Sequence, residues 1–199
     1  DNIKLNILSF NQKTNCMRLL LLILFSPIFL FAQSTDIDDL LEKVDELNGV
    51  EKADVLFEIG NILMDEEYDE AIINFSEAYE LYEKYESKYQ IHYVEAKLAY
   101  IYIKKGDFKQ AEKFLKQAYP FFILMDNSTD KCALFDHMGL YYMYQYKFDL
   151  ALAYFDSALT ISEMFKFDEQ SMTIKANSAL IYLSTRSEER RVGKEGRSR

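Results

Sequence analysis

The sequence of 199 residues contains no tryptophan, two prolines and six glycines. Because Gly and Pro mark turns, so few of them favour long helices and argue against a β fold. Two cysteines, Cys16 and Cys132, are too few for a disulfide framework. Two histidines, His92 and His137, have no cysteine or histidine at metal-site spacing beside them. The sequence therefore indicates neither a disulfide scaffold nor a metal centre.

Positive charge is also scarce, with 23 Lys+Arg against 33 Asp+Glu and a net charge of −10. Nucleic-acid binding needs clustered Lys and Arg to neutralise phosphates, so we expect no nucleic-acid partner. There is no glycine-rich phosphate loop and no nucleophile elbow. We therefore expect a protein that is not an enzyme and needs no cofactor. The 49% hydrophobic content is sufficient for a folded core.

A short apolar run occupies residues 19–31, after Met17-Arg18 and before Ala32-Gln33. A basic start, an apolar stretch and a small residue before a polar one predict a secretory signal peptide, cleaved after Ala32. The run is shorter than the roughly 20 residues of a membrane-spanning helix, although an uncleaved anchor is the alternative. We expect export to the periplasm, with residues 1–16 upstream of the true start. Contact with the membrane would come only through this segment or through sequence beyond the chain.

The other end, residues 186–199, reads RSEERRVGKEGRSR and lacks apolar periodicity. It resembles the translation of a common sequencing adapter; the alternative is a disordered basic tail. On the first interpretation this segment is not native, and the natural protein continues beyond Thr185.

Between these ends, residues 33–185 carry an internal repeat. Ala71, Ala111 and Ala151 follow one another at a step of 40 residues, which is typical of stacked helical repeats. Two helices that pack 8–10 Å apart need small residues where they cross. We expect these crossing points at Gly60, Ala71, Ala78, Ala99, Ala111, Ala118, Gly139, Ala151 and Ala158.

The pattern predicts a capping helix over 36–48, helix pairs over about 51–88, 89–128 and 129–167, and half a pair over 168–185. We expect Gly60 to face Ala71 within the first pair. Pro120 removes a backbone donor, so the helix that contains it should kink or break near Tyr119.

The units share parts of one pattern: a large residue and then Gly or Ala, an aromatic, a turn, and an Ala–aromatic–Ala series, with Leu63 at the first aromatic position of the first unit and Leu115 between the alanines of the second. This arrangement resembles the tetratricopeptide repeat family, and the third unit matches it best, with Phe135, Gly139, Tyr142, Phe148, Ala151, Phe155 and Ala158. Glu95 departs from the pattern, since a large apolar residue is usual there. The resemblance implies an all-α solenoid of about 3.5 repeats that binds proteins or peptides. It is similar to the exported N-terminal regions of bacterial signalling proteins with a histidine kinase or helix-turn-helix output.

In this family a ligand lies along a concave groove formed by the first helix of each pair. Carried over, the resemblance implies a protein or peptide bound at Phe57, Asn61, Met64, Tyr93, Tyr100, Ile103, Leu140, Met143 and Tyr144. The same face includes Ala96, Asp136, Leu180 and Leu183. The alternative is that several of these residues pack against neighbouring repeats.

The family's carboxylate-binding version needs Lys, Arg and Asn on neighbouring helices, and only Asn61 and Lys104 approach it. A partner with apolar anchors and some positive charge fits better. We expect the extracytoplasmic sensor or scaffold part of a signalling protein. The alternatives are a free periplasmic scaffold for envelope assembly or transport, and the substrate-recruiting region of an enzyme.

Overall fold

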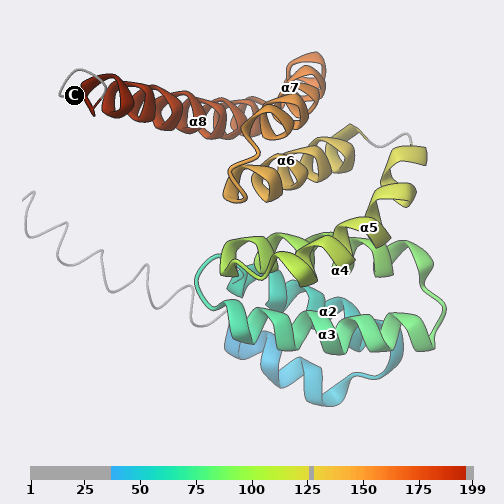
Figure 1. Ribbon diagram of the computed structural model, residues 1–199. Coiled ribbons are helices and arrows are strands. Elements are labelled where there is room, and N and C mark those ends of the chain that lie inside the picture. Colours follow the sequence, from blue (N-terminus) through green and yellow to red (C-terminus); the bar gives the residue numbers. More distant parts are fainter. Residues whose placement is uncertain (1–36, 126–127, 196–199) are drawn as a thin grey trace, which may run out of the picture. The chain divides into compact units, whose positions relative to one another are not determined.

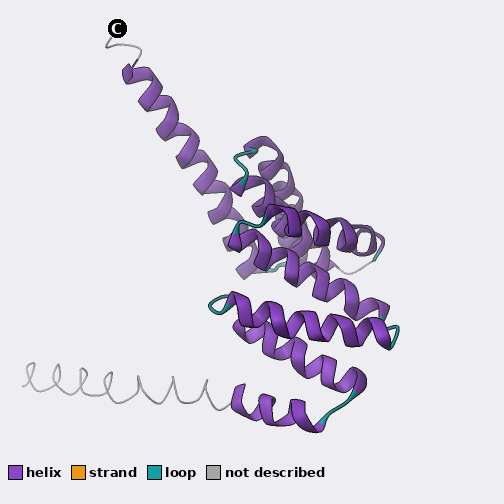
Figure 2. Cartoon of the chain, turned by 60° about the horizontal axis from the view of Figure 1, so that its bottom comes forward, coloured by secondary structure: helices purple, strands orange, loops and turns teal. Residues whose placement is uncertain are grey.

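The computed structural model describes residues 37–125 and 128–195, with side chains described as far as Ser187. Every secondary-structure element within these ranges is a helix (Figures 1 and 2), which confirms the expected all-α class. The expected signal peptide lies outside the described residues. None of the described helices is both long and apolar enough to span a membrane.

The chain divides into two compact units, Asp1–Asn48 and Gly49–Arg199. The described part of the first unit contains one helix, over residues 37–46. The second unit contains α2 (Gly49–Leu63), α3 (Tyr68–Lys84), α4 (Lys88–Lys105), α5 (Phe108–Leu124), α6 (Ser128–Tyr144), α7 (Phe148–Phe165) and α8 (Asp168–Glu195).

Within the second unit each helix packs against its neighbours in the sequence. The most extensive contacts join α2 to α3, α4 to α5 and α6 to α7. The first helices of successive pairs also touch, because α4 contacts α6 and α6 contacts α8. Side chains that project from α4, α6 and α8 can therefore meet across pairs.

The turns between helices differ in how they supply a left-handed residue. Gly106 follows α4 as its C-cap with a φ of 77°. Asp107 then accepts a hydrogen bond from the Gln110 backbone N–H at 3.1 Å. The equivalent turn after α6 places Tyr146 at a φ of 60°. Because the left-handed conformation costs an L-residue about 1–2 kcal/mol, Tyr146 makes its turn at a cost that Gly106 avoids.

The small residues expected at helix crossings are all buried in the second unit. Gly60 makes room for the Phe75 ring, and its expected contact with Ala71 stays a prediction. A Cβ added at Gly60 would lie 2.8 Å from Phe75 Cε1, and one at Gly139 would lie 2.4 Å from Phe155 Cδ1. Phe75 lies one helical turn after Ala71, and Phe155 lies one turn after Ala151. Each ring is therefore on the same face as its alanine and reaches the glycine of the facing helix.

Two helices continue past expected interruptions. α5 remains helical through Pro120, and its last turns leave the direction of the first ones (Figure 1), so the helix bends without breaking. α8 continues through Thr185 to Glu195, beyond the range 168–185 expected for this helix. No glycine, proline or left-handed residue interrupts the backbone at Thr185 itself.

Candidate binding face

Side chains from the turn after α2, from α4 and from α6 form a row across the second unit, which we call the polar row: Asp65, Lys97, Tyr100, Asp136 and His137. The Tyr100 hydroxyl donates to Asp65 Oδ1 at 3.2 Å. On its other side, the Tyr100 ring lies 5.0 Å from the His137 ring, centroid to centroid. One phenol thus links the end of α2 to the middle of α6.

The polar row extends to α8 and back to α2 through two weaker contacts. Asn177 Nδ2 of α8 donates to Asp136 Oδ1 at 3.4 Å. Lys97 Nζ lies 3.8 Å from the Met64 sulfur, a weak acceptor. Three helices, α4, α6 and α8, and the turn after α2 therefore contribute to one face of the second unit.

The charges of the polar row are only partly compensated. Burial raises the pKa of Asp136 to about 6, against the opposing effects of the Asn177 hydrogen bond and the Lys104 charge. Burial also lowers the pKa of Lys97, although Asp65 and Asp130 favour its charged form. A buried carboxylate with a raised pKa is one whose charge lacks sufficient stabilisation by its surroundings.

Two buried polar atoms on this face have no hydrogen-bond partner within the described part of the chain, Asn61 Oδ1 and His137 Nδ1. Burial and the nearby Lys97 charge lower the pKa of His137 to about 3, so the imidazole is neutral at pH 7. A buried polar group left without a partner costs about 1–3 kcal/mol. A ligand group that reached either atom would recover part of that free energy.

A cluster of aromatic side chains lies near the start of α4 and α6. The Tyr93 hydroxyl donates to Asp130, and it lies 2.7 Å from the Tyr89 hydroxyl. The Tyr93 ring packs edge-on against Phe122 with centroids 5.2 Å apart. Tyr93 is therefore engaged within the protein rather than presented freely.

The other residues expected to contact a ligand differ in how deeply they are buried. Ile103 and Leu140, at 1% and 4% exposure, lie in the core, so their expected place at a ligand-contacting surface is wrong. Ile103 stands one turn after Ala99 and shares its buried face. Leu140 belongs to the buried cluster that also contains Ile181. Phe57 is half-buried, with its ring 5.4 Å from that of Phe75.

Met143 and Tyr144 border a cavity of about 280 Å³ between the end of α6 and α8. Leu180 lines the same cavity, and both Leu180 and Leu183 are exposed. Ala96 is half-buried next to Lys97. The polar row and this apolar end together offer polar and apolar contacts on the same set of helices.

Sequence reasoning missed Lys97 and His137 as members of this face. Lys97, His137 and Asn177 follow one another at the 40-residue step, so the periodicity of the small residues also contained this signal. It was overlooked because each residue, taken singly, is typical of a solvated helix surface.

No protein-family model matches the chain, and no curated protein matches it in sequence. Among the residues that the structure describes, no three His, Cys, Asp or Glu side chains are grouped closely enough to hold a metal ion.

Proposed function

We propose that this chain is a non-catalytic module of tetratricopeptide-like repeats that binds a protein or peptide along the polar row. The observation that carries the proposal is the link from Asp65 through Tyr100 to His137, which spans three helix pairs. An extended peptide needs such a series of contacts along its length, supplied by rigid helices.

The pairing of α2 with α3, α4 with α5 and α6 with α7 supports the repeat assignment, because repeat proteins pack each unit against the next. The unpartnered Asn61 and His137 atoms support a ligand that carries hydrogen-bonding groups, as a peptide backbone does. Exposed Tyr144 and half-buried Met143 supply adaptable apolar contacts at one end of the face.

The partner is a segment with apolar anchors and at least one basic residue. Asp65 and Asp136 lie in the polar row, and the buried Asp136 carboxylate holds a raised pKa. A lysine or arginine of the partner placed near Asp136 would stabilise the ionised carboxylate and return its pKa toward the ordinary range.

The test is selection from a random peptide library displayed on phage, followed by titration calorimetry of the selected peptides. We expect enrichment of peptides that combine Lys or Arg with apolar residues. The double substitution Tyr100→Ala with Tyr144→Ala should weaken their binding at least about tenfold, the usual loss when contact residues are truncated.

The matched control is Tyr85→Ala, which removes an exposed tyrosine at the end of α3. Selected peptides that are uniformly acidic, or that bind the double variant as tightly as the unchanged protein, would rule out the polar row as the binding face.

Export to the periplasm, as part of a signalling protein or as a free scaffold, remains our proposal on the basis of residues 17–33. Expression of the chain from Met17 in a bacterium, followed by N-terminal sequencing of the periplasmic fraction, tests it. A mature protein that begins at Gln33 is expected. A chain retained in the cytoplasm with Met17 intact would contradict it.

A further inference from the structure

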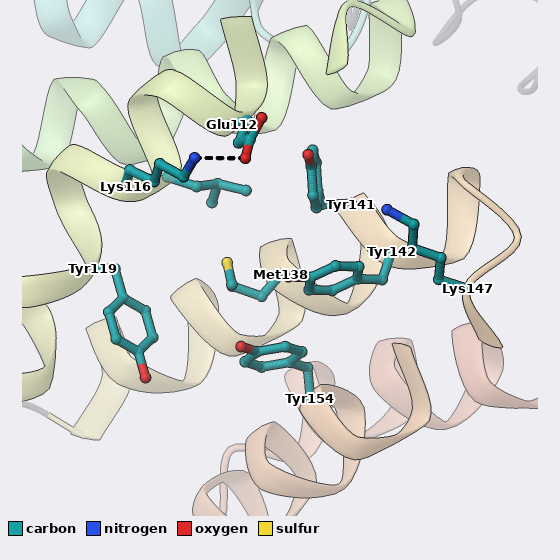
Figure 3. A pocket seen from close by; sticks show the side chains of 9 residues that line it. Glu112, Lys116, Tyr119, Met138, Tyr141, Tyr142, Lys147 and Tyr154 are labelled. Carbon is teal, nitrogen blue, oxygen red and sulfur yellow. Dashed lines mark ion pairs between the residues drawn. The ribbon is translucent and has the colours of Figure 1, made fainter. Parts of the chain in front are cut away.

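A second concavity lies between α5, α6 and α7, and no residue of the polar row lines it (Figure 3). Its volume is about 400 Å³. Small-molecule sites in proteins are typically concave spaces of roughly 300–1,000 Å³ lined by aromatic and apolar side chains with a few polar groups. This cavity has the dimensions of such a site.

Four of its nine lining residues are tyrosines, which come from three helices: Tyr119 of α5, Tyr141 and Tyr142 of α6, and Tyr154 of α7. The Tyr142 and Tyr154 rings stack with centroids 5.5 Å apart, and Tyr141 meets Tyr142 edge-on at 5.1 Å. Figure 3 shows Tyr119 across the cavity from this stacked pair. Within the described residues, none of the four hydroxyls has a protein hydrogen-bond partner, so all are available to a ligand.

The charges around the cavity favour an anion. Lys116 and Lys147 line it together with one carboxylate, Glu112. Glu112 Oε1 already pairs with Lys116 Nζ at 2.6 Å (Figure 3). Lys147 Nζ lies 5.8 Å from the centroid of Tyr142, a position over the ring that a cationic ligand would otherwise take. In a chain of net charge −10, this wall carries a local excess of positive charge.

Size narrows the ligand class further. An apolar cavity of about 150 Å³ holds one benzene ring. A space of about 400 Å³ therefore accommodates an aromatic ring with a short side chain. We propose that this cavity binds a small aromatic carboxylate, with the ring against the tyrosines and the carboxylate near Lys116 and Lys147. The site is separate from the peptide-binding face and does not depend on it.

The test uses the full chain and three probes of matched shape: 3-(4-hydroxyphenyl)propanoate, its amide, and the amine tyramine. Binding is followed in NMR spectra of protein labelled with ¹³C at the methionine methyl groups, where Met138 reports from the cavity. We expect the carboxylate to shift the Met138 signal with a dissociation constant of the order of 1 mM, usual for a ligand of this size. The amide and the amine should bind at least about fivefold more weakly.

Two double variants separate the cavity from the rest of the surface. Lys116→Gln with Lys147→Gln should weaken carboxylate binding about tenfold. Lys109→Gln with Lys113→Gln removes the same charge from α5 outside the cavity. This variant should change the affinity for the carboxylate less than about twofold. The proposal is overturned if the amine or amide binds as tightly as the carboxylate, if the Met138 signal does not move, or if the two double variants behave alike.

Discussion

The contact between Gly139 and Phe155 gives the sharpest test of how the helix pairs pack. Gly139→Ala adds a methyl group that would lie 2.4 Å from two atoms of the Phe155 ring. Ordinary carbon contacts are about 3.5–4.0 Å, so the ring must shift by more than about 1 Å. Phe155 is only 1% exposed, so there is little space for that shift.

The expected free-energy change combines two opposing effects. Overpacking of this kind costs about 1–3 kcal/mol, and the upper part of that range applies because two ring atoms clash. Replacing a helical glycine by alanine returns about 1 kcal/mol in helix propensity. We therefore expect Gly139→Ala to lower the free energy of unfolding by about 2 kcal/mol.

The second pair carries Ala99 and Leu115 at the positions of Gly139 and Phe155, and both are buried. This suggests a compensating substitution, Phe155→Leu, which alone should cost about 1–2 kcal/mol through the cavity it leaves. In the double variant the added methyl group fills part of that cavity. Its free energy of unfolding should be at least about 1 kcal/mol higher than the value expected if the two single changes simply added.

The assay is urea unfolding followed by circular dichroism for the unchanged chain, both single variants and the double variant. Gly60→Ala is the internal comparison and should cost less, because its added Cβ would lie 2.8 Å from the Phe75 ring rather than 2.4 Å. Single effects that add to within about 0.5 kcal/mol would refute direct contact as the cause.

Two further predictions concern the turns and the polar row. Tyr146→Gly should stabilise the protein by about 1 kcal/mol in urea unfolding, because it removes a left-handed tyrosine. Tyr144→Gly, at the last residue of α6, should not stabilise it. Since burial raises the pKa of Asp136 to about 6, the folded protein bears the cost of its charge above that pH, and the cost disappears as pH falls toward about 4. Asp136→Asn should therefore stabilise the protein at pH 7 by about 1–3 kcal/mol and have no effect at pH 4, and an equal effect at both pH values would contradict this cause.

The all-α class could be predicted because it depends on local periodicity and on the scarcity of Gly and Pro. The burial of the nine small residues expected at crossings could also be predicted, because a fixed step in the sequence marks equivalent positions in successive pairs. The close approach of the Phe75 ring to Gly60 could not be predicted, because the reach of that ring depends on its rotamer and on the helix crossing. The burial of Ile103 likewise depends on how α4 turns against its neighbours.

The binding face was predicted only in part for a related reason. Tyr100 was identified by its position in the repeat, but its bond to Asp65 and its ring contact with His137 join residues far apart in the sequence. The tyrosine-lined cavity draws on α5, α6 and α7 together, and no short motif contains its wall. Such sites follow from how pairs stack, which a reading of one pair at a time does not include.

The neighbour-to-neighbour packing of α2 to α8 has a consequence for how this unit opens. Because each helix contacts mainly the helices next to it in sequence, losing one helix exposes mainly its immediate neighbours. Stability in such a chain is a sum of local contributions, and the ends open at lower free energy than the middle. Amide hydrogen exchange should accordingly be slowest in α4 to α6, the helices that carry Tyr100 and His137.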